Sequence, residues 1–128
     1  MAVGARRYRR LHRLSAAPAP GTVLCRVEDL ADLGTKGFSF WTGELMFRGF
    51  VVRHGERIIG WRDRCPHIGT PLSFGDDRYL TRDGAMILCS THGAVFRIED
   101  GLCLGGPCAG RALTPWPVEV RGDDVVVA

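Results

Sequence analysis

Two short segments, each pairing a cysteine with a histidine, constrain this chain more than any other feature. One residue separates Cys65 from His67, two residues separate Cys89 from His92, and 21 residues lie between the segments. Each segment follows a stretch with β-strand composition, so both should lie at strand ends. Thiolates and imidazoles select zinc or iron–sulfur clusters rather than magnesium or calcium. The sequence therefore predicts a metal centre with four protein ligands.

The spacing within each segment bears on which metal is held. Structural zinc sites generally place two to four residues between paired ligands, and the single Pro66 is short for that. A cluster of two metals removes the difficulty, because each segment can give its cysteine to one metal and its histidine to the other. A structural zinc module with a binding function stays the less favoured alternative.

These residues resemble the Rieske iron–sulfur proteins. The resemblance runs through residues 65–72 and 89–96, and residues 101–107 look like the proline-containing third loop of that family. It covers about residues 22–128 and implies one Rieske 2Fe-2S cluster. By this resemblance, one iron is held by Cys65 and Cys89 and the other by His67 and His92.

The resemblance also bears on the reduction potential. High-potential members carry Ser and Tyr hydroxyls after the second histidine, and these donate hydrogen bonds to the cluster; the matching positions here are Ala94 and Phe96. Those members also carry a disulfide between the two loops, for which the matching cysteines are missing here. We therefore expect the low-potential, ferredoxin-like branch.

Short apolar runs separated by Gly and Asp turns predict an all-β fold. With 17 Gly and 7 Pro, we expect an antiparallel β-sandwich or small barrel with a cluster-binding subdomain. Only residues 27–33 favour a helical turn. The expected strands cover residues 22–27, 45–52, 57–61, 86–88, 94–96, 118–120 and 125–127.

Charge and composition divide the chain of 128 residues into two parts. Residues 1–21 form a basic arm that we expect to be flexible, and residues 22–128 form one Rieske 2Fe-2S domain. The arm holds five of the 17 basic residues, so the domain has 12 basic against 14 acidic residues, which argues against nucleic acid as a partner. No apolar run is long enough for a membrane span.

Location is inferred from the arm and from the cysteines. Five cysteines are an odd number, which is atypical of a secreted disulfide framework, so we expect a cytoplasmic protein. The alternative is targeting to an organelle through the Arg-rich N-terminus.

Several other residues have simpler explanations. Cys25 should be a small buried side chain, while Cys103 and Cys108 either pair as a disulfide or pack as thiols. Asp63 should be a solvated turn residue, as should Asp76 and Asp77 within the polar surface loop of residues 75–84. Four aromatic residues should lie in the core: Trp41, Phe47, Phe50 and Trp61. Four apolar loop residues should either shield the cluster or dock a partner: Ile68, Pro71, Leu72 and Pro107.

A ligand set on a chain too short for a second catalytic domain indicates an electron-transfer protein. We expect a soluble one-electron carrier, a ferredoxin that passes electrons from a flavin-dependent reductase to a terminal oxygenase or similar enzyme. The alternative is a small subunit of a larger oxidoreductase such as a nitrite reductase. No catalytic residue is expected in either case.

Overall fold

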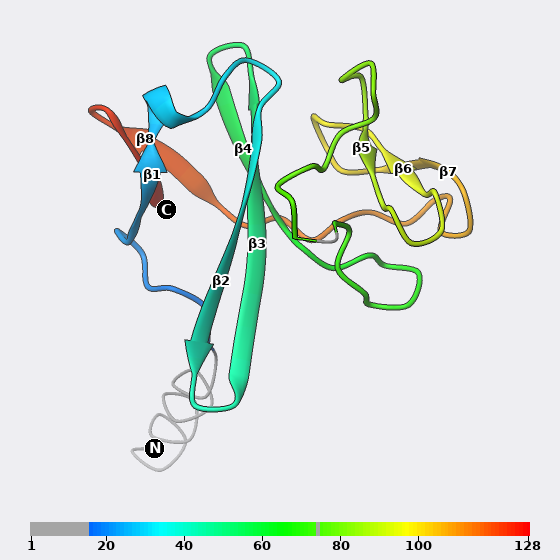
Figure 1. Cartoon of the computed structure of the whole chain (residues 1–128), viewed down its shortest axis with the longest axis horizontal. Helices are drawn as coiled ribbons and strands as arrows, with labels where there is room; N and C mark the ends of the chain where they lie inside the picture. The colour runs from blue at the N-terminus through cyan, green and yellow to red at the C-terminus, as the bar shows by residue number, and fades with distance from the viewer. Residues whose placement is uncertain (1–15, 74) are drawn as a thin grey trace, which may run out of the picture.

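The computed structural model describes residues 16–73 and 75–128, which form short β-strands and almost no helix (Figure 1). Most of the expected arm, residues 1–15, lies outside the described residues. Ala16 packs against the cluster of buried residues that includes Cys25, and the Gly21 amide donates to the Val127 carbonyl at 2.7 Å. The elements in chain order are β1 Val23–Arg26, the 3-10 helix η1 Val27–Asp29, β2 Thr35–Thr42, β3 Leu45–His54, β4 Arg57–Arg62, β5 Ile87–Leu88, β6 Val95–Phe96, β7 Cys103–Gly105, β8 Val118–Arg121 and β9 Asp124–Val127.

Two three-stranded antiparallel sheets form the base of the molecule, in the orders β1-β9-β8 and β2-β3-β4. Trp116 joins them: its amide donates to the Gly60 carbonyl at 3.0 Å, and its ring lies against Phe47 with the centroids 5.2 Å apart. A Cβ at Gly49 would come within 2.4 Å of that ring. Gly49 therefore makes room for the contact between the sheets.

The third sheet, β5-β6-β7, lies to the right in Figure 1, with β2-β3-β4 between it and β1-β9-β8. It has a core of its own, in which Leu72, Ile87 and Phe96 are fully buried. Phe50 of β3 and Trp61 of β4 also belong to this core. The small sheet and its loops are therefore a subdomain packed on one face of β2-β3-β4.

The expected all-β fold is confirmed, including both hairpins, and the helical turn expected in residues 27–33 is η1. Cys25 is buried as expected. Strands β2 and β7 were not expected. The β2 sequence interrupts its apolar residues with Lys36, Gly37 and Ser39, which weakens the alternation by which a strand is recognised.

The expectation that Trp41 lies in the core is wrong, because 66% of its surface is exposed. It sits near the end of the edge strand β2, opposite Met46, which is also exposed. Its neighbour Phe40 packs toward Trp116 instead. By the strand register, Trp41 and Met46 share a face with Phe50, but they lie at the far end of that face, which is exposed.

The expectation that Asp63 is a solvated turn residue is also wrong. Its side chain is 1% exposed, and its carboxylate accepts hydrogen bonds from the Leu72 amide at 2.7 Å and the Tyr79 hydroxyl at 2.8 Å. The Arg48 guanidinium lies 3.5 Å away. Tyr79 comes from the segment between the two Cys/His loops, where Asp76 and Asp77 are exposed as expected. That segment is thus anchored to the core through Tyr79.

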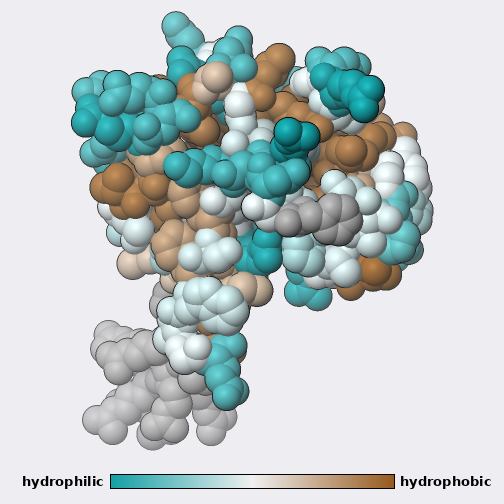
Figure 2. All heavy atoms as spheres, viewed as in Figure 1, coloured by the Kyte–Doolittle hydropathy of each residue, from teal (hydrophilic) through white to brown (hydrophobic). Residues whose placement is uncertain are grey.

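The surface in the view of Figure 2 mixes hydrophilic residues with smaller hydrophobic patches, and hydrophilic residues gather toward the outer parts. Among residues 16–73 and 75–128, no helix has the length and apolar character that crossing a membrane requires.

Replacing Tyr79 by Phe should reduce the free energy of unfolding by about 1–3 kcal/mol, because the buried Asp63 carboxylate loses a hydrogen-bond donor. The ring would still stack on Phe50, with centroids 4.1 Å apart, so packing is preserved. Urea titration of both proteins measures the difference. Asp83→Asn, in the same segment but exposed, is the control and should change little; equal effects of the two substitutions would contradict the assigned role.

Candidate metal centre

The first loop, residues 63–72, turns back on itself through two backbone hydrogen bonds. The Gly69 amide donates to the Cys65 carbonyl at 2.7 Å, and the Cys65 amide donates to the Thr70 carbonyl at 2.8 Å. Gly69 has a φ of +79°, a conformation that residues with a Cβ rarely adopt. The bond from the Leu72 amide to Asp63 closes the base of this loop.

The second loop, residues 89–94, repeats the same turn. The Gly93 amide donates to the Cys89 carbonyl at 2.9 Å, and the Cys89 amide donates to the Ala94 carbonyl at 2.8 Å. Gly93 has a φ of +75°. Each cysteine therefore begins a turn that ends at a glycine four residues later.

The two loops bring like side chains together in pairs. The Ser90 amide donates to the Leu72 carbonyl at 2.8 Å, which links the loops. Cys65 and Cys89 are fully buried and lie close together: burial raises the pKa of Cys65, and the neighbouring Cys89 thiol adds to that shift. The rings of His67 and His92 meet edge to face with centroids 4.9 Å apart, and His92 is exposed. Thiols thus form the inner side of the site and imidazoles the outer side.

Buried polar atoms without partners mark this site. Within the described residues, His67 Nδ1 and Thr70 Oγ1 are buried and have no hydrogen-bond partner. An unpaired buried nitrogen costs free energy, and coordination to a metal would remove that cost. Burial raises the pKa of the Cys65 thiol, so holding a thiolate there requires a compensating positive charge. Both features fit an inorganic centre between the loops.

The third loop, expected at residues 101–107, is here taken as residues 103–111, that is, β7 and the turn after it. It covers the second loop. Gly106 has a φ of +95°, and a Cβ there would lie 2.8 Å from Ala94 Cα, so the close approach requires glycine. The Arg111 guanidinium donates to the Pro66 carbonyl at 3.1 Å and ties this loop to the first.

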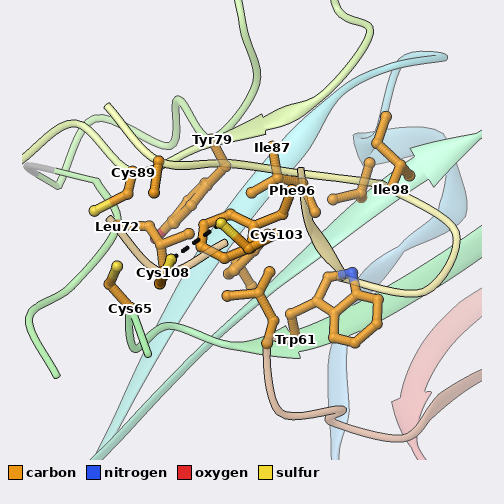
Figure 3. Packing of buried hydrophobic residues seen from close by; sticks show 14 residues of the cluster. Trp61, Cys65, Leu72, Tyr79, Ile87, Cys89, Phe96, Ile98, Cys103 and Cys108 are labelled. Carbon is orange, nitrogen blue, oxygen red and sulfur yellow. Dashed lines mark hydrogen bonds between the residues drawn. The ribbon is translucent and has the colours of Figure 1, made fainter. Parts of the chain in front are cut away.

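The third loop also adds two thiols to the buried side of the site. All five cysteines are free, so Cys103 and Cys108 are packed thiols and not a disulfide. Cys108 donates to the Cys103 sulfur at 3.1 Å, and Cys103 donates to the Gly105 carbonyl at 3.2 Å (Figure 3). Cys108 also lies beside Cys65, close enough that each thiol shifts the pKa of the other. Sequence reasoning missed this contact, because nothing in the spacing places residue 108 beside residue 65.

The apolar loop residues differ in burial, which bears on the two roles that were left open. Leu72 is fully buried in the core of the small sheet, so it shields the site. Ile68 is 56% exposed beside His67, so it does not shield the site, and docking stays a prediction for it. In the first loop, shielding and exposure therefore fall to different residues.

The sequence model of the Rieske [2Fe-2S] domain family matches residues 22–125. The chain belongs to this family. It therefore carries one Rieske 2Fe-2S cluster and is a one-electron carrier. Ala94 and Phe96 of this Rieske domain are fully buried and supply no hydroxyl to the cluster.

Relatives agree in sequence and in fold. Ferredoxin CarAc of Metapseudomonas resinovorans is 35% identical over 78 residues, which cover 61% of this chain and 67% of the relative. A solved complex of reduced oxygenase and oxidized ferredoxin in carbazole 1,9a-dioxygenase contains a chain 27% identical, with a TM-score of 0.66, covering 83% of this Rieske protein and 99% of that chain. The ferredoxin of carbazole 1,9a-dioxygenase from Nocardioides aromaticivorans IC177 is 21% identical, with a TM-score of 0.66 over 86% of this chain and 98% of its own, and shares the fold.

Proposed function

We propose that Cys65 and Cys89 hold one iron of the cluster and that His67 and His92 hold the other. The pairing of the side chains supports this: the two buried thiols lie close together, and the two imidazoles are in contact. The buried, unpartnered Nδ1 of His67 is a nitrogen ready to bind a metal.

The protein acts as a ferredoxin that passes single electrons to a terminal oxygenase. This proposal rests chiefly on a 27% identical chain from a solved complex of an oxygenase and a ferredoxin. The match covers 83% of this protein and 99% of that chain. The exposed imidazole side supports it, since electrons need a short route from the cluster to a partner. Supply by a flavin-dependent reductase in the cytoplasm follows from the same role, and the odd number of cysteines favours that compartment.

We infer that, once Cys65 binds iron as a thiolate, the Cys108 S–H turns from Cys103 to Cys65 and supplies a hydrogen bond to the cluster in place of the missing hydroxyls. Burial and, after it, the neighbouring sulfurs of Cys103 and Cys65 together raise the pKa of Cys108 to about 12, so the thiol keeps its proton at neutral pH. A hydrogen bond to a ligand sulfur stabilises the more negative, reduced cluster and raises its potential. Because S–H is a weak donor, the potential stays in the lower part of the Rieske range.

Cys108→Ala should lower the midpoint potential, because the donor to Cys65 is lost. Cys103→Ala removes the same volume from the same loop but leaves Cys108 with Cys65 as its sulfur acceptor, so its potential should equal or exceed that of the unchanged protein. Spectroelectrochemical titration of the three proteins measures the order. Equal downward shifts in both variants would assign the effect to packing and refute the hydrogen bond.

A carrier and a fixed subunit differ in how they exchange electrons. The protein is purified alone, reduced, and mixed with the oxygenase of carbazole 1,9a-dioxygenase. It should be reoxidised with about one electron transferred per chain, since a single 2Fe-2S cluster carries one electron. Stopped-flow absorbance follows the reoxidation, and the mixture without oxygenase is the control. Copurification with a large enzyme, together with no electron transfer in trans, would instead establish a subunit such as that of a nitrite reductase.

A further inference from the structure

An arginine-lined cavity of about 220 Å³ lies beside the first loop. Arg48 of β3, Arg62 at the end of β4 and Arg64 of the loop line it together with Gly69 and Pro71. A second cavity, of about 400 Å³, is lined by Cys65 and His67. Arg64 and Gly69 line both cavities, so the arginine cavity is next to the metal centre.

The positive charge of the arginine cavity is only partly neutralised within the described residues. Of the described residues that line it, only Asp63 is acidic, and its ion pair with Arg48 offsets one of the three arginine charges. Among the ion pairs of residues 16–73 and 75–128, neither Arg62 nor Arg64 has a carboxylate partner. Arg62 instead lies over the Phe47 ring, 4.8 Å from its centroid.

The three arginines reach the cavity to different degrees. Arg48 is half-buried, and its Nε is closed to solvent, whereas Arg62 and Arg64 are exposed. Arg62 and Arg64 are therefore the guanidinium groups open to an incoming anion. A carboxylate is the acceptor whose geometry a guanidinium matches best on a protein surface.

The surroundings of the arginine cavity suit a short-lived protein contact. Met46 at its edge is 44% exposed, and Ile68 in the adjoining cavity is 56% exposed. Arginine next to apolar side chains is typical of protein interfaces. From residue 22 onward the chain has more acidic than basic residues, so the positive charge here is local.

We propose that the arginine cavity formed by Arg48, Arg62 and Arg64 receives an aspartate or glutamate side chain of the redox partner, and so docks an acidic face of that protein beside His67. This rests on the proposed function as an electron carrier. Docking there would bring the partner next to the outer, imidazole side of the cluster. The arginines would then speed association more than they tighten the complex.

Two small oxidants of opposite charge test the proposal without any biological partner. The reduced holoprotein is mixed with ferricyanide, an anion, or hexaammineruthenium(III), a cation, at low ionic strength in a stopped-flow instrument. The double variant Arg62→Gln/Arg64→Gln should be oxidised by ferricyanide about five-fold more slowly, because the local attraction is lost. Its oxidation by the ruthenium complex should not slow. This is the control for a changed reduction potential, because a smaller driving force would slow oxidation by both complexes.

Arg57→Gln, at the opposite end of β4, is the matched control and should keep the unchanged rate with both oxidants. A hexaglutamate peptide should slow ferricyanide oxidation of the unchanged protein and have little effect on the double variant. Equal losses in the double variant and the control, or equal inhibition of both by the peptide, would overturn the proposal. Because neither oxidant is a biological partner, these outcomes are separable from failure to reduce an oxygenase.

Discussion

The buried Asp63 carboxylate joins three parts of this structure that are distant in sequence. It accepts from the Leu72 amide in the first loop, accepts from the Tyr79 hydroxyl in the connecting segment, and lies near Arg48 of the base sheet. A buried charge is tolerated only where donors and opposite charge compensate for its lost hydration. The orientation of the cluster-binding subdomain on the base therefore depends on this carboxylate and its three partners.

Sequence reasoning succeeded where local pattern decides the outcome. The hairpins follow from apolar runs broken by turn residues, and the two Cys/His loops follow from ligand type and strand context. It failed where a distant partner decides, as at Asp63, whose burial depends on Tyr79 16 residues later. The prediction for Trp41 was wrong for a related reason: its size favours burial, but no other part of the described chain covers the end of β2 where it lies.

The site separates into a buried sulfur side and a more exposed nitrogen side. Cys65, Cys89 and Cys108 lie among apolar side chains at one edge of the core, where few waters can solvate added charge (Figure 3). His92 is exposed, and Ile68 and Arg64 lie near the outer side. The interior thus sets the reduction potential, while the outer loops determine which proteins approach. This division suits a carrier that must meet two partners and stay bound to neither.

The most direct test of this account is the metal content of anaerobically purified protein, with an EPR spectrum after dithionite reduction. The account predicts the two irons and two sulfides of a Rieske 2Fe-2S domain in each chain, with a Rieske-type spectrum. The cluster should be lost in Cys89→Ala and kept in Cys25→Ala, which removes a buried thiol of the base. One zinc and no sulfide in protein expressed with ample iron, or an intact cluster in Cys89→Ala, would contradict it.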